Sequence, residues 1–315
     1  MESFSNIPVL ITGAEGFIGS HLTRRLAGEG ARVTALVRPG ADLSRLAGRD
    51  GRIAIHPLDI RRRSELSALT AAARPVWVFH LAAVTDPSRS PAGLDRCLEV
   101  NLGGTLNLLR SLAGIPCERL LAVDTAEIYG RNPAPFREDM VPDPISPYSL
   151  SKAAATLLCR TWAAAYGFPV TVLRLFLAYG PGQGPERFLP QLLDAGFSGR
   201  PFRMTAGEQT REYTYIDDVV EGCLIAARRG PPGEIINLGS GEEISLRELV
   251  EKVGKILRRR VVLDPDTLPY RENEIWRFVG DHSRAARLLG WRARIDLEEG
   301  LVRTIAAYPG KGNGR

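Results

Sequence analysis

The chain has 315 residues, of which 44% are hydrophobic and 24% charged, which is typical of a globular protein with one large domain or two. Its net charge of +5 comes without a long basic stripe, so we do not expect nucleic-acid binding. The four cysteines show no metal-ligand spacing, no apolar run is long enough for a membrane span, and the N-terminus lacks signal-peptide features, so we expect no metal, no membrane contact and a cytoplasmic location.

Short β-branched runs alternate with helical patterns through the first half of the chain. The periodicity predicts strands at 9–11, 32–37, 53–55, 76–81, 120–123 and 170–175, and helices at 17–27, 42–46, 64–73, 94–112 and 149–166. Near-continuously apolar strands alternating with helices are typical of a parallel sheet covered on both faces. We therefore expect the α/β class, as a doubly wound (Rossmann) fold with its ligand crevice at the carboxyl ends of the strands.

The regular alternation stops after residue 177, at a stretch rich in glycine and proline. One more helix and one more strand follow within 214–240 and are expected to return to the sheet. We therefore predict a Rossmann domain from 1–177 and 214–240, and a smaller, discontinuous C-terminal substrate domain from 178–213 and 241–315. The polar end at 310–315 is expected to be disordered.

Three glycines, Gly13, Gly16 and Gly19, lie three residues apart between the first strand and the first helix. A glycine-rich turn in this context exposes backbone N–H groups and the positive end of the helix to a pyrophosphate. The stretch therefore predicts a dinucleotide site that includes Phe17 and Ile18, the first residues of the helix.

The end of the second strand bears on the choice of cofactor. Val37 stands where an acidic residue that binds the ribose 2′-hydroxyl is expected, and Arg38 follows it. An arginine there can pair with a 2′-phosphate, which favours NADP over NAD. The alternative is that Arg38 stacks on adenine or faces solvent.

Tyr148 precedes Lys152 by four residues at the start of a predicted helix, which places both on one face. A lysine ammonium near a phenol favours the phenolate, so the tyrosine could act as a general base nearer neutral pH. Behind a dinucleotide-binding turn, this pair predicts redox chemistry at a hydroxyl group.

Together these motifs make the chain resemble the extended short-chain dehydrogenases/reductases, specifically the nucleotide-sugar (NAD-dependent) epimerase/dehydratase family. The matching segments run in order through nearly the whole chain and include TGAEGFIGSHL, FHLAA, VNLGGTLNLL, DTAEIYG, SPYSLSKAAA, GEQTREYTYIDDVV and INLGSGEEISL. Part of the pattern is also similar to GDP-6-deoxy-mannose reductases.

The resemblance implies roles for individual residues. Tyr148 would be the general base, Lys152 would hold it and the nicotinamide ribose, and Thr125 would bridge the sugar 4-hydroxyl. Further cofactor contacts are implied for Asp59, Ile60, Leu81, Ala82, Ala83 and Asn101.

The segment DTAEIYG bears on the type of reaction. Dehydratases of the family often carry a Thr, a short acid and a Glu, the last of which takes the C5 proton. Thr125 and Glu127 match this pattern, but Ala126 cannot donate a proton. Glu127 is therefore a candidate second base, with a structural carboxylate as the alternative. Asp124 occupies a position where a small hydroxyl residue is commoner, and its role does not follow from the sequence.

On the substrate side, Arg211 and Arg271 match family arginines that clamp the nucleotide diphosphate, a task that suits bidentate guanidinium groups. Leu177 departs from the pattern because the family often has an asparagine there. The helices at 94–112 and 149–166 are expected to form a homodimer through a four-helix bundle, by resemblance.

The function expected is a nucleotide-sugar epimerase or dehydratase that oxidises C4 transiently with bound NAD(P). The alternative is an NADPH-dependent reductase of 4-keto-6-deoxy nucleotide sugars. A remote alternative is a non-catalytic dinucleotide-binding module, which would usually lack the tyrosine or the lysine.

Overall fold

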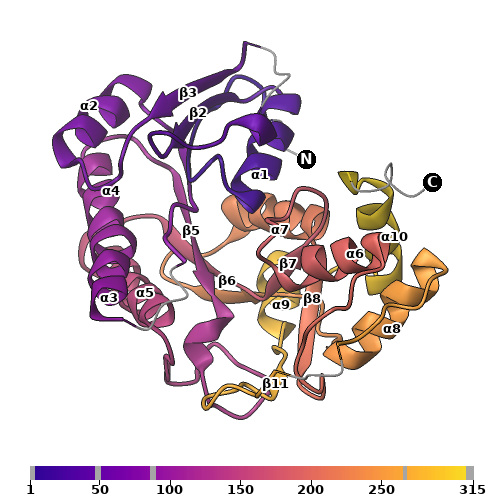
Figure 1. Cartoon of the computed structure of the whole chain (residues 1–315). Helices are drawn as coiled ribbons and strands as arrows, with labels where there is room; N and C mark the ends of the chain where they lie inside the picture. Colours follow the sequence, from indigo (N-terminus) through magenta and orange to yellow (C-terminus); the bar gives the residue numbers. More distant parts are fainter. Residues whose placement is uncertain (1–3, 47–50, 86–89, 265–267, 310–315) are drawn as a thin grey trace.

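A parallel sheet of seven strands is the larger of two sheets in the computed structural model, which describes residues 4–46, 51–85, 90–264 and 268–309 (Figure 1). The spatial order is β3-β2-β1-β4-β5-β6-β9. The strands are β1 (Pro8–Thr12), β2 (Arg32–Val37), β3 (Ile53–Pro57), β4 (Trp77–His80), β5 (Arg119–Thr125), β6 (Val170–Leu175) and β9 (Ile235–Leu238). This confirms the predicted Rossmann class, and the order reverses between β1 and β4, where such sheets bind ligands.

Helices cover both faces of this sheet. Helices α1 (Phe17–Gly28) and α7 (Ile216–Arg229) pack against each other on one face. On the other face lie α2 (Arg63–Ala73), α4 (Gly104–Leu112) and α5 (Pro147–Tyr166). Figure 1 shows this layering, with α1 close to α7 and α4 close to α5.

Two predicted helices differ from the structure. The segment expected to be one helix over 94–112 is α3 (Pro91–Cys97), a π-helical segment η2 (Leu98–Gly103) and then α4. The segment 42–46 forms only a 3₁₀ turn, η1 (Ser44–Leu46). A π turn is wider than an α turn and carries no signature in a 3.6-residue period, so the pattern could not reveal it.

A second, smaller sheet is built around β8 (Thr210–Tyr215). This strand pairs with β10 (Glu243–Ser245), β11 (Arg277–Phe278) and β7 (Leu177–Tyr179). The helices of this part are α6 (Phe188–Ser198), α8 (Leu246–Leu257), α9 (Ser283–Leu289) and α10 (Leu297–Ala306). Strand β8 runs across the boundary predicted between 213 and 214, and the division into two domains stays a prediction. The segment 310–315 lies outside the described residues.

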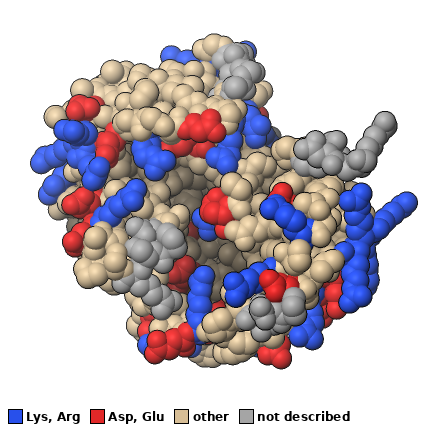
Figure 2. Space-filling view, viewed as in Figure 1, with Lys and Arg blue, Asp and Glu red and all other residues tan. Residues whose placement is uncertain are grey.

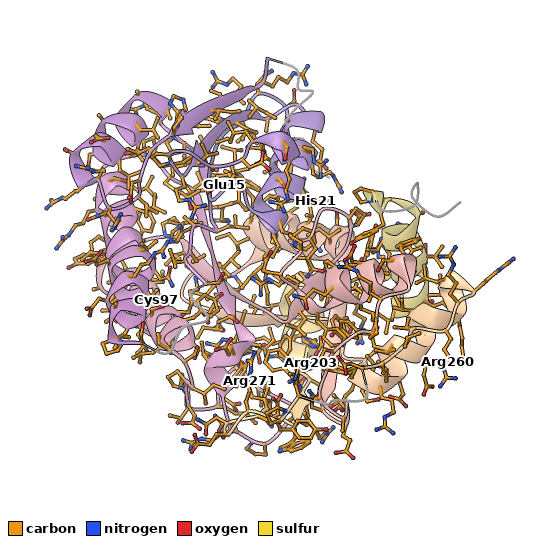
Figure 3. The ribbon with its side chains drawn as sticks, viewed as in Figure 1. Glu15, His21, Cys97, Arg203, Arg260 and Arg271 are labelled. Carbon is orange, nitrogen blue, oxygen red and sulfur yellow. The ribbon has the colours of Figure 1, made fainter. Side chains whose placement is uncertain are left out.

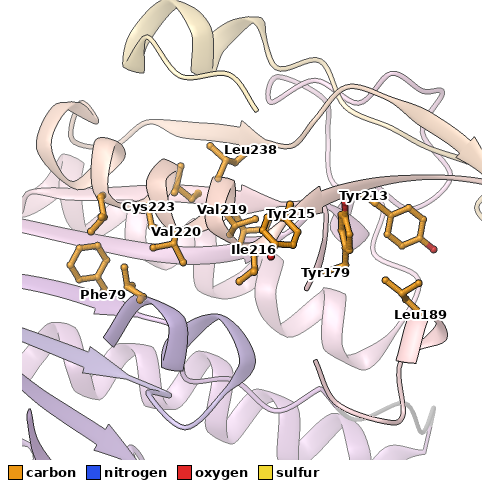
Figure 4. Close-up of a cluster of buried hydrophobic side chains, with 14 of the residues drawn as sticks. Phe79, Tyr179, Leu189, Tyr213, Tyr215, Ile216, Val219, Val220, Cys223 and Leu238 are labelled. Carbon is orange, nitrogen blue, oxygen red and sulfur yellow. The ribbon is translucent and has the colours of Figure 1, made fainter. Parts of the chain in front are cut away.

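One cluster of buried apolar side chains joins the two sheets. It extends from Phe79 on β4 through Val219 and Cys223 on α7 to Tyr213 on β8 (Figure 4). Because the core is continuous, the second sheet packs directly against the first and fixes the walls of the space between them.

The outer face of α5 leaves apolar side chains in solvent. Leu150 is 43% exposed and Leu157 is 57% exposed. Such a face agrees with the expected helix pairing, and the homodimer stays a prediction. No helix in the described part of the chain is long and apolar enough to cross a membrane.

Candidate active site

The space-filling view shows a hollow between the sheet of β1–β6 and the part of the chain that carries β8, α6 and α8 (Figure 2). Strands β1, β4 and β5 end at this side, and the short segment η3 (Ala126–Tyr129) follows β5 directly. The carboxyl ends of the strands therefore bring the glycine turn and the Thr–Tyr–Lys residues of the sequence motifs to one region.

The glycine turn after β1 is packed so closely that side chains would not fit. Gly13 has φ +71°, and a Cβ built on it would lie 2.8 Å from the backbone nitrogen of Ala82. A Cβ on Gly19 would lie 2.1 Å from the Gly13 carbonyl oxygen. Gly16 is the N-cap of α1, and no side chain among the described residues caps it. The start of the helix thus leaves its N–H groups to a ligand, which fits a pyrophosphate.

The turn after β4 is tied to β1 through buried polar contacts. The Thr12 hydroxyl accepts a hydrogen bond from the Ala82 N–H at 3.2 Å and lies 2.7 Å from His80 Nδ1. His80 Nε2 lies 2.9 Å from the Thr105 hydroxyl. Burial lowers the pKa of His80 to about 3, so the ring is neutral. Leu81, Ala82 and Ala83, which follow β4, are thereby held beside the glycine turn.

The other residues predicted to hold the cofactor lie along the ends of β2 and β3. Arg38 is exposed immediately after β2. The Asp59 carboxylate forms an ion pair with Arg61 at 2.7 Å, which lowers the pKa of Asp59. The Ile60 side chain is buried against Gly104 in the core, and the Ile60 carbonyl accepts a hydrogen bond from Asn107 at 3.3 Å.

Helix α5 positions Tyr148 and Lys152. It begins at a capping box in which the Ser146 hydroxyl accepts the Ser149 N–H, and Pro147 occupies its first turn. Lys152 is buried, and its Nζ donates to the Val123 carbonyl of β5 at 2.6 Å. The Thr125 side chain lies close enough to the Tyr148 phenol to lower the pKa of the phenol. The structure therefore brings Thr125, Tyr148 and Lys152 together at the end of β5.

The electrostatic surroundings of Tyr148 differ from the expectation that Lys152 favours its phenolate. Burial raises the pKa of Tyr148, and the carboxylates of Asp124 and Glu127 raise it further. The nearby Thr125 side chain and the charge of Arg187 lower this pKa. The Lys152 ammonium is directed to the Val123 carbonyl, and burial lowers its own pKa.

Glu127 lies in η3, directly after Thr125. One carboxylate oxygen accepts a hydrogen bond from Ser146, the cap of α5. Its backbone N–H donates to the Thr125 hydroxyl at 3.3 Å. Ala126 is fully buried against Phe136 and Tyr129, so its side chain points away from the hollow. Glu127 is thus both close to Tyr148 and tied to the start of its helix.

Asp124 belongs to a buried network whose other members are distant in sequence. Its Oδ2 accepts a hydrogen bond from Arg174 Nε at 2.9 Å, and both side chains are almost completely buried. Arg174 also donates to the Tyr129 hydroxyl at 2.7 Å, and Tyr129 donates to Asn237 Oδ1 at 2.7 Å. The network joins β5, β6 and β9 behind Thr125, which accounts for a charged residue at this position.

Asn101, predicted to contact the cofactor, links two neighbouring elements. Its side-chain oxygen accepts the Val84 N–H at 2.8 Å, and its Nδ2 donates to the Val84 carbonyl at 3.1 Å and to the Ser151 hydroxyl at 2.8 Å. Asn101 lies in the π-helical segment η2, which directs its side chain into the core. In this structure it positions the residue that precedes Lys152.

We predict that Asn101→Ala lowers the free energy of unfolding by about 2–3 kcal/mol, because the buried groups of Val84 and Ser151 lose their partners. Chemical denaturation followed by circular dichroism measures this. The matched control is Asn107→Ala on α4, where only long contacts of 3.3 and 3.2 Å to backbone carbonyls are lost. Equal stabilities of the two variants would contradict the role of Asn101.

The two arginines that the sequence motifs predict to bind substrate both lie in the region of the second sheet. Arg211 on β8 forms an ion pair with Glu274 and donates to the Ile275 carbonyl at 2.7 Å. Arg271 is exposed in the turn that ends at Glu274. Leu177 pairs with Tyr213 at the edge of this sheet, where it adds apolar surface instead of the amide that the family often has.

The glycine turn, the uncapped start of α1 and the cluster of Thr125, Tyr148 and Lys152 lie together at the carboxyl ends of the strands of a Rossmann fold. The family model described as the NAD dependent epimerase/dehydratase family matches residues 9–239. The chain belongs to this family.

Relatives of both reaction types cover almost the whole chain. A UDP-glucuronate 4-epimerase of Thermodesulfobacterium geofontis is 30% identical, with 94% of each chain covered. A dTDP-glucose 4,6-dehydratase of Streptomyces griseus is 31% identical, with 95% of this chain and 93% of that one covered. A crystal structure of a UDP-glucuronic acid 4-epimerase from Bacillus cereus, in complex with UDP-glucuronic acid and NAD, superposes with a TM-score of 0.87 at 27% identity and covers 95% of this chain and 98% of that one.

Proposed function

We propose that the protein is a nucleotide-sugar 4-epimerase that works with bound NAD. The observation that carries this proposal is the cluster of Thr125, Tyr148 and Lys152 at the end of β5, with no acidic side chain at position 126. The similarity to 4-epimerases with near-complete coverage, one of them in complex with NAD, supports it.

In the proposed reaction, Tyr148 and Thr125 act on the proton and the oxygen of the sugar C4 hydroxyl. When bound, NAD supplies a hydride acceptor and donor for C4. Tyr148 takes the proton from the C4 hydroxyl as its O–H bond breaks, and Thr125 donates a hydrogen bond to the oxygen that becomes a carbonyl. Tyr148 then returns the proton to the same oxygen once C4 is reduced from its other face. Lys152, whose Nζ donates to the Val123 carbonyl, would hold the ribose of the bound nicotinamide.

The surroundings of Ala126 favour epimerisation over dehydration. Loss of water from a sugar requires an acid for the leaving hydroxyl and a base for the neighbouring carbon. Ala126 is buried and has no proton to donate, and Glu127 is engaged with Ser146. A 4,6-dehydratase remains the second candidate because Glu127 lies close enough to Tyr148 to raise its pKa.

The test is to incubate the purified protein with a panel of nucleotide sugars, with and without NADPH, and to separate the products by chromatography coupled to mass spectrometry. We expect a new isomer of unchanged mass without added cofactor. A product lighter by one water would show a dehydratase. A reaction that requires both NADPH and a 4-keto sugar would show the reductase.

The variant Glu127→Gln distinguishes epimerisation from dehydration, because only dehydration needs a second base. An epimerase should keep most of its rate in this variant, whereas a dehydratase should lose about 10²–10⁴-fold in kcat with its second base. The matched control is Glu118→Gln, an exposed residue just before β5.

A further inference from the structure

The glycine turn contains a charged residue, Glu15, whose side chain reaches the end of β2. Its Oε1 accepts a hydrogen bond from the Arg38 backbone N–H at 3.1 Å. The turn itself is fixed on β2, because the N–H groups of Gly13 and Ala14 both donate to the Leu36 carbonyl, at 3.0 and 3.3 Å. In Figure 3, Glu15 lies next to α1, across the hollow from Arg271. The carboxylate is therefore anchored at a defined place.

The second oxygen of this carboxylate is buried. Glu15 Oε2 finds no hydrogen-bond partner among the described residues. A buried carboxylate oxygen without a donor is costly, and a ligand that brings a hydroxyl donor to it removes this cost. Glu15 Oε2 is therefore suited to accept a hydrogen bond from a donor on a bound ligand.

The end of β2 is where a Rossmann fold places the adenosine ribose of a dinucleotide, and an acidic residue there usually binds the ribose 2′-hydroxyl. In this chain the residue at that place, Val37, is a buried apolar side chain. A carboxylate does contact this strand end, and it comes from the glycine turn, through Glu15.

We infer that Glu15 selects NAD over NADP by accepting a hydrogen bond from the ribose 2′-hydroxyl, in place of the missing acid on β2. This inference rests on the proposed use of a bound dinucleotide. A 2′-phosphate carries between one and two negative charges at neutral pH and has little capacity to donate, so it would meet Glu15 as a like charge.

Arg38 provides the competing interaction. Its side chain is exposed, and its backbone N–H is bound to Glu15, so the guanidinium can reach a 2′-phosphate at the strand end. Because the Glu15 oxygen is buried and the Arg38 side chain is in solvent, the carboxylate interaction is screened less and should dominate. The inference therefore predicts a preference for NAD, whereas Arg38 in the sequence favours NADP.

The experiment uses the full-length protein after removal of bound dinucleotide. Titration calorimetry gives the dissociation constants of NAD⁺ and NADP⁺ for the wild type, Glu15→Gln, Arg38→Ala and the matched charge control Glu251→Gln on the exposed face of α8. The dinucleotide that co-purifies with the protein is identified separately by chromatography after acid release.

We expect the wild type to bind NAD⁺ at least tenfold more tightly than NADP⁺ and to co-purify with NAD. Glu15→Gln keeps an acceptor for the Arg38 N–H but loses the charge, so the ratio should fall by roughly tenfold, mainly through tighter NADP⁺ binding. Arg38→Ala and Glu251→Gln should leave the preference for NAD⁺ in place.

Two results would overturn the inference. A wild-type preference for NADP⁺ that Arg38→Ala abolishes would assign the choice to Arg38, and an unchanged ratio in Glu15→Gln would show that Glu15 does not read the ribose. If the wild type binds neither dinucleotide, the proposed function fails, and the inference fails with it.

Discussion

Tyr148→Phe should lower kcat by about 10²–10⁴-fold and leave the binding of the dinucleotide nearly unchanged. In the proposed mechanism the Tyr148 phenol takes the proton from the C4 hydroxyl, and its removal leaves Thr125 and Lys152 in position. The measurement is the initial rate of isomer formation, together with the amount of dinucleotide released from the denatured protein. Tyr166→Phe on the same helix is the matched control, because Tyr166 lies at the exposed end of α5.

The pH dependence of the wild type provides a second readout. Burial and two carboxylates raise the pKa of Tyr148, so the phenol is mostly protonated at neutral pH and must lose its proton to act as a base. We therefore expect kcat/KM to rise with pH through the neutral and alkaline range, about tenfold per pH unit below that pKa. If Tyr148→Phe kept more than a tenth of the wild-type rate, with the same pH profile, Tyr148 would not be the general base.

Asp124→Ala should lower the free energy of unfolding by about 3–5 kcal/mol, because it leaves the guanidinium of Arg174 buried without its carboxylate. Thermal or urea unfolding measures the effect. Asp143→Ala is the control, since Asp143 pairs with Arg131 at the surface and its loss should change stability little.

A double variant, Asp124→Leu with Arg174→Met, separates the cost of an unpaired charge from the value of the ion pair. Removing both charges should restore most of the stability lost in Asp124→Ala. If the double variant is as unstable as the single one, packing explains the loss and the unpaired charge does not. In Asp124→Asn, the pKa of Tyr148 should fall, and the rise of kcat/KM should shift to lower pH.

The elements with a long, regular pattern could be predicted from the sequence. Strand β2 has the predicted bounds, and α1, α2 and α5 each differ from their predictions at one end only, by one or two residues. The strands of the second sheet could not be found this way, because β7, β10 and β11 have only two or three residues each. A period of two residues has no meaning over such lengths, and their pairing with β8 is decided by the packing of the core.

The residues of the candidate site also differ in whether a local sequence pattern reveals them. Tyr148 and Lys152 follow from their spacing of four residues, which places both side chains on one face of a helix, whereas Thr125 follows from the family resemblance. The contact of Asp124 with Arg174 spans 50 residues, and that of Asn101 with Ser151 spans another 50, so neither has a local signal. Glu15 does have a local signal, because it is a charged residue inside the glycine motif. The hydrogen bond of its side chain with the Arg38 N–H, however, forms only in the folded chain.

The π-helical segment constrains how this part of the chain can change in evolution. Before this segment, α3 packs on α5, and after it, α4 packs mainly on α2. The wide π turn therefore lets consecutive helices of one continuous segment pack against two different neighbours. Substitutions within Leu98–Gly103 can be absorbed as long as its number of residues is kept. A gain or loss of one residue there would rotate Asn101 away from Ser151 or α4 away from α2, so the length of this segment is fixed more strictly than its composition.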